Sequence, residues 1–412
     1  MFLISKIKNL FFPFYRIDET KKIFSILNSK NKKEAMFVGG CVRKYLLKED
    51  VDDIDIATTL TPDEIIKKFE NTEIKVKKTG IEHGTLTLVL GKKKFEVTTL
   101  RKDLSTDGRH ADIEFTENWK KDSERRDFTI NSIYLDEKGK IYDPQEGFRD
   151  LKNNKVKFIG NADARIKEDY LRILRFLRFS IQYRSFEIDK QTQKAIKINL
   201  NGITKLSKER VYSELEKTII LNNFYDLLQN EFLTKIFKLI FPEFTYLDRI
   251  KKLKKLKNVK IDKDLIFAIM LIDSSNNHKY FFHKYNLPKD LIKNLDLFSD
   301  ILKEIKLKKD FFSEDLKKNI FLYGRINMRN LFLIHSIINK KTLTSQIKEI
   351  LEKINRISIP KFPVTGNDLI KLGLSRGIKV GEVLKKIEHK WIDNNFKIKQ
   401  EEIKILVENY VD

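Results

Sequence analysis

Hydrophobic and polar positions follow two different periods along the chain, and the change falls near residue 150. Between about residues 34 and 150, short runs such as AMFVGG and DDIDIAT alternate or end at glycines, which predicts strands and tight turns. GTLTLVL and KFEVTTL, separated by GKKK, predict a β-hairpin. TPDEIIKKF predicts a helix, because Thr caps it, Pro follows and acidic residues fill the first turn. We therefore expect an α/β unit here.

Beyond residue 150 the pattern is helical. Apolar residues recur every three to four positions among lysines, and Pro and Gly become scarce, which predicts stacked helices to the end of the chain. The stretch IPKFPVTGNDL, at residues 359–369, interrupts this pattern and predicts the start of a last small unit.

Composition narrows the class of protein. With 412 residues and 41% hydrophobic residues, the chain can build real cores, which excludes disorder throughout. Cys41 is the single cysteine, which excludes a disulfide scaffold or a cysteine-based zinc site and predicts a cytoplasmic protein. No uncharged run reaches the ~20 residues of a spanning helix, so we expect no membrane partner. Lys and Arg total 82 against 59 Asp and Glu, and the net charge of +23 favours a polyanionic partner, nucleic acid first and an acidic membrane second.

The acidic pair Asp53 and Asp55 is the first candidate for chemistry. In a strand, side chains two residues apart point to the same face, so the two carboxylates converge while Ile54 and Ile56 point into the core. Mg²⁺ in proteins commonly uses one or two carboxylates plus substrate phosphates, and two such ions can clamp the attacking and leaving oxygens of a displacement. The pair therefore indicates a magnesium site, although an isolated DxD is more often a solvated strand end.

A glycine turn precedes this pair. Gly39 and Gly40 stand between a predicted strand and a predicted helix, where backbone N–H groups can cradle a triphosphate, and Arg43 follows one turn later. The alternative is a tight turn with no ligand. Glu96, on a later strand, is a candidate third acid, with a surface-facing glutamate as the alternative.

Two arginine-rich runs follow. In RRDFTIN, Arg125 and Arg126 are predicted either to face phosphate or ribose or to form a salt-bridged helix cap. The second run is a predicted helix on which three-residue steps place four charged residues on one stripe, with Glu168 and Arg172 as i,i+4 neighbours. These residues are Asp169, Arg172, Arg175 and Arg178. Because that helix is otherwise apolar, its charges need partners; an ordinary ion-paired helix is the alternative.

Together these segments resemble the class II nucleotidyltransferases, which comprise bacterial CCA-adding tRNA enzymes and their poly(A) polymerase relatives. Five motifs occur in order: GGCVRKYLL with DDIDIAT, RRDFTINSI, DPQEGFRDL, EDYLRILR and SKERVYSEL. Five motifs in register are far more specific than any one of them. FPVTGNDLIKLGLSRGIKVGEVLKKIEHKWI also resembles the tail of many CCA-adding enzymes. One departure is Lys44, where the family usually has Asp.

The resemblance implies an α/β nucleotidyltransferase head with a small mixed sheet and helices, followed by an all-α neck, body and tail. The expected segments are an N-terminal helical segment (1–33), the head (34–150), the neck (151–220), a tRNA-binding body (221–345) and a tRNA-binding tail (346–412). The resemblance further implies a monomer.

The resemblance also assigns roles to residues. Asp53 and Asp55 would hold Mg²⁺ as the catalytic pair. The glycine turn and two arginines would contact the phosphates or sugar of the incoming nucleotide: Gly39, Gly40, Arg43 and Arg126. Asp169 and Arg172 would read its base, with Arg175 and Arg178 supporting the pocket. The DPQEGFRDL turn would act as a hinge between head and neck, and the segment 207–215 would brace the neck.

The implied reaction is template-independent addition of CCA to the 3′ end of tRNA, using CTP and ATP and releasing pyrophosphate. The chemistry of the bases agrees with it. Cytosine and adenine each present an amine donor beside a ring nitrogen acceptor, which a carboxylate and a guanidinium can complement. Uracil and guanine present the reverse pattern, so one protein edge accepts CTP and ATP and rejects UTP and GTP.

Three other functions compete with this prediction. A poly(A) polymerase shares the motifs, but those relatives commonly have an Arg-rich stretch in place of GIEHGTLTL. An enzyme adding only C or only A is third; RKDLSTDGRHADIEF, at the position of the family's flexible loop for the C-to-A switch, favours a complete enzyme. A non-enzymatic, helical RNA-binding protein is last, because the carboxylate pair is intact. The lysine-rich segments 251–263 and 303–309 are candidates for tRNA contacts, with solvated faces as the default.

Overall fold

The computed structural model describes residues 13–28, 32–106, 111–256, 259, 261–273, 275–306, 308, 310–339 and 344–410. The chain divides into two compact units. The first contains residues up to Pro242 together with Lys284–Asn286, and the second contains Glu243–His283 and the chain from Leu287 onward. The finer division into five segments stays a prediction. Parts of two expected features lie outside the described residues, namely 1–12 and 29–31 of the N-terminal segment and 107–110 of the expected flexible loop.

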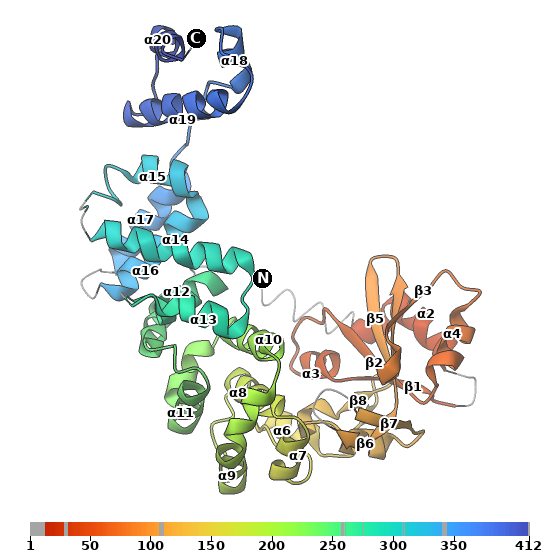
Figure 1. Cartoon of the computed structure of the whole chain (residues 1–412). Helices are drawn as coiled ribbons and strands as arrows, with labels where there is room; N and C mark the ends of the chain where they lie inside the picture. The colour runs from red at the N-terminus through yellow and green to blue at the C-terminus, as the bar shows by residue number, and fades with distance from the viewer. Residues whose placement is uncertain are drawn as a thin grey trace. The chain divides into compact units, whose positions relative to one another are not determined.

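A seven-stranded mixed sheet forms the centre of the first unit, in the order β3-β4-β5-β2-β1-β8-β9 (Figure 1). β2 runs parallel to β5, and the other neighbours are antiparallel. The strands are β1 (Ala35–Val38), β2 (Ile54–Thr58), β3 (Lys75–Gly80), β4 (Thr85–Leu90), β5 (Lys93–Thr99), β8 (Tyr134–Leu135) and β9 (Ile141–Tyr142). β6 (Arg101–Thr106) and β7 (Ala111–Phe115) form a separate hairpin. The expected β4–β5 hairpin is confirmed, and Gly91 in its turn has φ +59°.

One face of this sheet is the core of the head. Ile54, Ile56, Phe95 and Val97 are buried on it, as strand alternation requires. Two helices lie on this side, α2 (Asp18–Leu27) and α4 (Pro62–Phe69) (Figure 1). α2 is anchored by an aromatic contact, in which the ring of Phe24 lies 4.4 Å from that of Phe37 on β1. The opposite face carries Asp55 at the start of β2, beside a small buried cluster that includes Met36 and Ala57.

The expected cap of α4 is confirmed. The backbone N–H of Glu64 donates to the hydroxyl of Thr61 at 3.4 Å, and the N–H of Thr61 donates to the Glu64 carboxylate at 2.7 Å. This reciprocal pair is a capping box, and it satisfies two N–H groups that the first turn of a helix leaves unpaired.

Helices continue the first unit after the sheet. They are α6 (Gly147–Lys152), α7 (Ala162–Glu168), α8 (Leu171–Gln182), α9 (Lys190–Asn199), α10 (Lys208–Ile219) and α11 (Glu231–Ile240), with short 3₁₀ turns η4 (Leu200–Lys205) and η5 (Phe224–Gln229). α5 (Trp119–Glu124) and the 3₁₀ turns η1 (Phe14–Arg16), η2 (Ile81–His83) and η3 (Thr129–Asn131) belong to the head, as does α3 (Gly40–Leu46). α7 packs on α9, and α8 packs on α10. The expected change from a mixed sheet to helices is confirmed.

Gly147, at the start of α6, lies where no side chain fits. A Cβ at this position would lie 2.0 Å from the carbonyl oxygen of Thr129. The carboxylate of Asp143 accepts hydrogen bonds from the N–H groups of Gly147 at 2.9 Å and Phe148 at 2.8 Å. The DPQEGFRDL turn is therefore closely packed against η3, beside the segment that carries the motif RRDFTIN.

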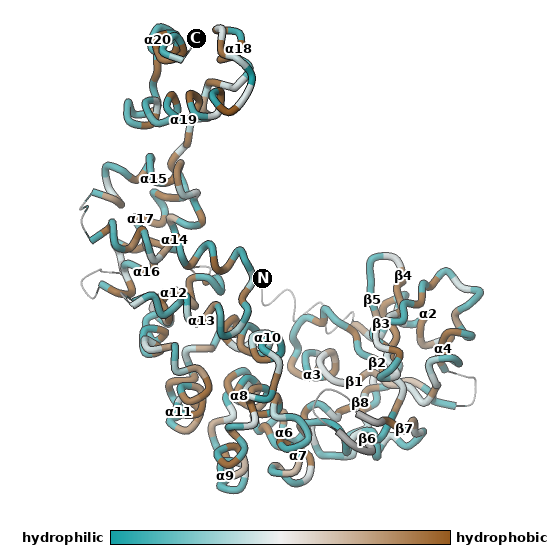
Figure 2. Tube along the Cα trace, in the orientation of Figure 1, coloured by the Kyte–Doolittle hydropathy of each residue, from teal (hydrophilic) through white to brown (hydrophobic). Residues whose placement is uncertain are grey.

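In the described residues of the second unit, the regular elements are all helices. It contains η6 (Leu247–Lys255), α12 (Lys263–Leu271), α13 (Asn277–Tyr285), α14 (Lys289–Ile305), α15 (Leu316–Tyr323), α16 (Arg325–Ile338), α17 (Thr344–Arg356), α18 (Gly366–Lys371), α19 (Ile378–Asp393) and α20 (Gln400–Glu408). Figure 2 shows hydrophobic positions interspersed with hydrophilic ones along these helices. α18, α19 and α20 share a small core of Val364, Leu369, Leu374, Val383, Ile387, Ile403 and Val407.

Across the described part of the chain, we find no helix with the length and apolar character needed to span a membrane.

Candidate active site

Asp53 and Asp55 lie at the start of β2. The strand begins at Ile54, so Asp53 stands in the bend before it and is exposed, whereas Asp55 lies within the strand and is half-buried. Within the described residues, neither carboxylate forms an ion pair. The nearby cationic groups of Arg126 and Arg43 act on Asp55 without forming an ion pair with it.

The environment of Asp55 disfavours its charge. Burial raises the pKa of Asp55, and the carboxylate of Glu96 raises it further, while Arg126 and Arg43 act in the opposite direction. Glu96 is the neighbour of Asp55 across the parallel β2–β5 pair, so both side chains lie on the same face of the sheet. A cation bound next to Asp55 would therefore stabilise the charged form of its carboxylate.

The glycine turn lies directly against Asp55. Gly39 has φ +75° and ψ −128°, a conformation that residues with a side chain rarely adopt. A Cβ on Gly39 would lie 3.4 Å from Oδ2 of Asp55, and one on Gly40 would lie 3.9 Å from the same oxygen. The buried thiol of Cys41 connects the same elements, because its Sγ lies 3.2 Å from the carbonyl oxygen of Val38 and 3.5 Å from that of Asp55. The turn and the acid thus lie side by side.

The donor set suits a divalent cation that shares its coordination with a substrate. Among the residues that the structure describes, no group of three or more His, Cys, Asp or Glu side chains could hold a metal by itself. Two carboxylates without a counter-ion match the way Mg²⁺ binds, with one or two carboxylates plus substrate phosphates. Asp53 and Asp55 therefore fit Mg²⁺, and Glu96 as a third ligand stays a prediction.

Lys44, the departure from the family pattern, has a definite partner. Its Nζ lies 2.9 Å from Oδ2 of Asp52, and both side chains are at the surface. This ion pair joins α3 to the bend that carries Asp53. An exposed pair of this kind contributes at most about 1 kcal/mol.

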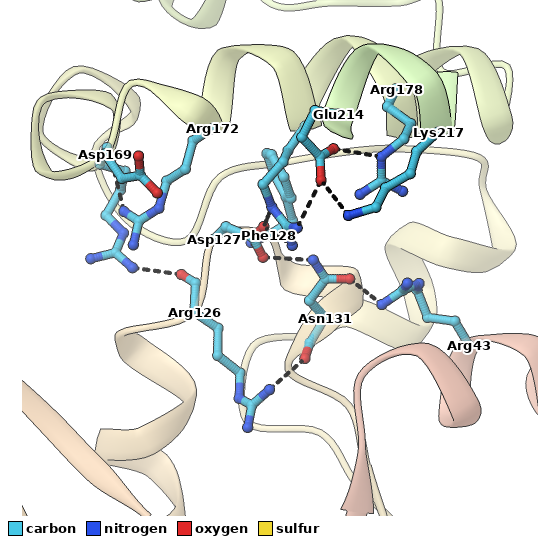
Figure 3. A network of polar contacts seen from close by, with 12 residues as sticks. Arg43, Arg126, Asp127, Phe128, Asn131, Asp169, Arg172, Arg178, Glu214 and Lys217 are labelled. Atoms are coloured by element: carbon cyan, nitrogen blue, oxygen red, sulfur yellow. Dashed lines mark hydrogen bonds and ion pairs between the residues drawn. The ribbon is translucent and has the colours of Figure 1, made fainter. Parts of the chain in front are cut away.

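Arg43 is positioned by residues of η3 and α8. Its Nε donates to the hydroxyl of Tyr183 at 3.0 Å, and Nη1 donates to Oδ1 of Asn131 (Figure 3). The guanidinium also lies over the ring of Phe179, 4.9 Å from its centre. The guanidinium therefore has a fixed direction, and its contact with a nucleotide stays a prediction.

Arg125 and Arg126 are held at the end of α5 by one buried acid. Asp122 is fully buried and lies 2.7 Å from Nη2 of Arg125 and 3.0 Å from Nη2 of Arg126; it also accepts a bond from the hydroxyl of Tyr134 at 2.7 Å. Burial opposes the charge of Asp122, but Arg126 and Arg125 overcome it and lower its pKa. The ion-paired helix end, the alternative to a phosphate contact, is thus present, and a nucleotide contact by Arg126 stays a prediction.

A series of hydrogen bonds runs through the motif RRDFTIN. Arg175 donates from Nε to Oδ2 of Asp127 at 2.6 Å, and Asn131 donates from Nδ2 to Oδ1 of Asp127, also at 2.6 Å. Since Asn131 also accepts from Arg43, the series links α8 to α3 through the turn η3 (Figure 3). Arg175 thus holds Asp127, and its role in supporting the nucleotide pocket stays a prediction.

The predicted charged stripe is not one continuous helix. α7 ends at Glu168 and α8 begins at Leu171, so Asp169 lies in the break between them. Oδ2 of Asp169 accepts a hydrogen bond from Arg210 at 2.8 Å, whereas Nη1 of Arg172 lies 2.6 Å from Oε2 of Glu168. Asp169 and Arg172 lie on the same side of the site in Figure 3, each with its own partner.

Gly202 explains where the break falls. A Cβ at Gly202 would lie 2.0 Å from Cδ1 of Tyr170, so the aromatic ring occupies the space that a side chain would need. The ring of Tyr170, seated on η4, fixes the backbone next to Asp169.

Arg178 has a buried partner. Its Nε donates to Oε2 of Glu214 at 2.8 Å, and the guanidinium lies 4.2 Å from the centre of the Phe179 ring. Glu214 is only 2% exposed and also binds Lys217 at 3.2 Å. This cluster connects α8 to α10, and the role of Arg178 in supporting the nucleotide pocket stays a prediction.

Some residues that organise the site were not singled out by the sequence pattern, namely Asp122, Tyr183, Arg210 and Glu214. Arg210 and Glu214 lie in the run SKERVYSEL, so that run is the signal that could have identified them. Asp122 and Tyr183 lie outside the five motifs and carry no such signal.

Comparison with known proteins supplies independent information. Residues 35–157 match the model of a poly(A) polymerase head domain. Residues 185–247 match a family described as a probable RNA- and SrmB-binding site of polymerase A.

Curated relatives match over most of their length. The chain is 33% identical over 392 residues to the mitochondrial CCA tRNA nucleotidyltransferase 1 of Danio rerio, covering 91% of this chain and 87% of the relative. It is 34% identical over 394 residues to the CCA-adding enzyme of Staphylococcus haemolyticus, covering 91% and 94%.

Solved structures share the fold. The Bacillus stearothermophilus CCA-adding enzyme in complex with CTP has a TM-score of 0.69 at 24% identity, covering 94% of this chain and 96% of that one. The Thermotoga maritima CCA-adding enzyme complexed with tRNA has a TM-score of 0.58 at 21% identity, covering 100% and 98%. At these identities the likeness shows the fold alone.

Proposed function

The chain belongs to the family of CCA-adding tRNA nucleotidyltransferases, and from this membership and the geometry of the head we propose that it adds C, C and A to the 3′ end of tRNA. The substrates are CTP and ATP, pyrophosphate is released, and no nucleic-acid template is used. Relatives with these names match more than nine tenths of the chain, which supports the whole reaction and not only the head chemistry.

One observation carries the proposal most directly. Asp55 faces the glycine turn of Gly39 and Gly40, with its Oδ2 3.4 Å from the position of a Cβ on Gly39. A triphosphate held by the N–H groups of this turn would place phosphate oxygens next to a carboxylate pair that has no counter-ion among the described residues. A cation bound by both the carboxylates and the phosphates would offset the repulsion between their negative charges.

In the reaction, the 3′-hydroxyl of tRNA attacks the α-phosphorus of the nucleotide, a new P–O bond forms, and the bond to pyrophosphate breaks. Mg²⁺ held by Asp53 and Asp55 would supply Lewis-acid stabilisation of the attacking and leaving oxygens. Gly39 and Gly40 hold the triphosphate, and Arg43, fixed by Asn131 and Tyr183, offers its cationic edge to it.

Base selection is assigned to the break between α7 and α8. The carboxylate of Asp169 accepts from the exocyclic amine of cytosine or adenine, and the guanidinium of Arg172 donates to the unprotonated ring nitrogen. Arg210 and Glu168 hold the two side chains at 2.8 and 2.6 Å, which supports a rigid reading edge. Arg175 and Arg178 support it through buried acids. The body and tail, at residues 221–345 and 346–412, are proposed to bind tRNA.

The test is incubation of the purified protein with Mg²⁺ and a tRNA transcript that ends at the discriminator base. CTP, ATP or both are supplied, and the product ends are sequenced. We expect CC with CTP alone and CCA with both nucleotides. A homopolymeric A tail identifies a poly(A) polymerase, and a product that stops at CC with both nucleotides, or that requires a CC-ending substrate, identifies a one-nucleotide specialist. No incorporation overturns the proposal.

A further inference from the structure

The order of strands places two different surfaces on either side of Asp55. β2 lies between β1, which leads into the glycine turn, and β5, which leads through β4 to the edge strand β3 (Figure 1). Displacement at phosphorus requires the attacking and leaving oxygens to lie roughly in line. If the triphosphate occupies the glycine turn, pyrophosphate leaves on the β1 side, and the attacking hydroxyl must approach from the β5 side.

The side chains on the β5 side are set by register. Asp55 is paired with Glu96, Glu96 with Thr87, and Thr87 with Lys77, so these four residues form one row across β2, β5, β4 and β3. The row lies on the face opposite the buried Phe95 and Val97. The polar row therefore starts at the catalytic acid and ends at the edge of the sheet.

Hydroxyl groups line this face in two hydrogen-bonded pairs. Thr79 and Thr87 have their hydroxyl oxygens 2.8 Å apart, and those of Thr85 and Thr98 are 3.0 Å apart. Lys94, two residues before Glu96, is exposed on the same face, as is Lys77. We name the surface formed by Lys77, Thr79, Thr85, Thr87, Lys94 and Thr98 the threonine face.

The chemistry of this face suits a sugar–phosphate backbone. Hydroxyl groups can donate to phosphate oxygens and accept from ribose 2′-hydroxyls, and lysines neutralise phosphates as point charges. The face has no aromatic side chain among the six residues that define it, so it offers no stacking platform and no preference between bases. An acceptor strand whose last nucleotides change at each addition needs this kind of contact.

We propose that the threonine face binds the ribose–phosphate backbone of the 3′-terminal single strand of tRNA and delivers its hydroxyl to the α-phosphorus beside Asp55. This inference rests on the proposed function and adds the path of the acceptor strand to it. Lys77 and Lys94 contact phosphates of that strand, and the hydroxyls of Thr79, Thr85 and Thr98 contact its ribose and phosphate oxygens. Thr87 is only 8% exposed, and its hydroxyl holds that of Thr79 in place.

Two double variants test this proposal. Lys77→Ala with Lys94→Ala removes both lysines of the threonine face. Lys78→Ala with Lys93→Ala is the control of equal charge change. Lys93 alternates to the helix side of β5, where Glu19 holds it at 3.0 Å, and Lys78 is an exposed lysine at the register shift of β3 that is outside the threonine face. KM and kcat are measured for tRNA and for CTP at several KCl concentrations, and thermal unfolding shows that both variants fold.

For the face variant we expect the KM for tRNA to rise about fivefold, with the KM for CTP unchanged and the control like wild type. In a plot of the logarithm of tRNA affinity against the logarithm of salt concentration, the slope should become shallower by about 0.7 for each lysine removed. This is the value for one phosphate contact on a single strand. A rise in the KM for CTP would place the lysines at the triphosphate and overturn the proposal. The same KM and kcat for tRNA in the face variant and the control would also overturn the proposal. The proposed function would remain supported in that case if the wild-type protein still adds CCA.

Discussion

The carboxylate of Asp169 is bound by Arg210, with 2.8 Å between Oδ2 and Nη2. Arg210 comes from α10, whereas Asp169 lies in the break between α7 and α8, so the proposed base-reading acid takes its orientation from a helix 41 residues away in sequence. If Asp169 reads the base as we propose, base selection depends on α10 as well as on the EDYLR motif.

Replacing Arg210 should loosen base selection without touching the acid pair. In Arg210→Ala, Asp169 loses its partner and can rotate, so we expect selectivity for CTP over UTP to fall about tenfold, within the 1–3 kcal/mol range of a good bidentate base contact. Arg210→Lys keeps a cation near Asp169 and should recover part of the loss. Competition between CTP and UTP for incorporation measures the ratio; a loss of kcat with unchanged selectivity would count against this role.

Arg172→Ala should relax selection against UTP more strongly. The guanidinium is the proposed donor to the ring nitrogen of cytosine and adenine, and uracil is rejected because its ring N–H faces that donor. The same competition assay applies. Glu168→Gln keeps Arg172 but weakens its 2.6 Å ion pair, and it should give a smaller effect in the same direction. Unchanged selectivity in Arg172→Ala would remove this residue from the reading edge.

Glu214→Gln should destabilise the first unit. Glu214 is 2% exposed, and its charge neutralises Arg178 and Lys217; without it, Arg178 is left facing an apolar interior. Removing one partner of a buried pair costs about 3 kcal/mol in the free energy of unfolding. Urea denaturation measures the change. Glu187→Gln, at an exposed position, is the control and should fall within about 0.5 kcal/mol of wild type.

Acid should remove the contribution of Asp127 to stability. Burial alone would raise the pKa of Asp127, but the ion pair with Arg175 overcomes burial and lowers the pKa to about 2. Because the folded pKa lies below the ordinary value of 3.8, the stabilisation of about 2 kcal/mol is fully present above about pH 5 and is lost as pH falls toward 2.

Unfolding of wild type and Asp127→Asn between pH 6 and pH 3 tests the sign of this effect. The difference in unfolding free energy between them should be constant above about pH 5 and should narrow below pH 4. A difference that widens with acid would contradict the assigned direction of the pKa shift.

Much of the head was predictable because its signals are local. The Thr61 cap, the β4–β5 hairpin and the strand-to-helix turn at Gly39 each depend on residues a few positions apart, and each is present. The sequence indicated Glu96 only as a candidate neighbour of Asp55, because their pairing depends on the parallel alignment of β2 and β5.

The details of the neck were not predictable in the same way. The charged stripe from Asp169 to Arg178 was expected on one helix, but Tyr170 packs on Gly202 and the helix is broken beside Asp169. Arg126 was expected at the nucleotide, and it is also an ion-pair partner of the buried Asp122. The contact of Tyr170 with Gly202 is tertiary, and local periodicity contains no information about it. The pair of Asp122 with Arg126 is instead an i,i+4 contact, which the sequence offered as the alternative of an ion-paired helix end.

The central claim is that Asp53 and Asp55 form the catalytic pair. The most direct test measures incorporation of CMP and AMP into tRNA that lacks CCA by Asp55→Ala and Asp53→Ala, together with tRNA affinity by filter binding. Asp52→Ala is the matched control, because Asp52 lies in the same bend and is 70% exposed. We expect incorporation of both nucleotides to fall by roughly a thousandfold or more in the two catalytic variants, tRNA affinity to be unchanged, and the control to be active. Turnover near wild type in Asp55→Ala would contradict the account.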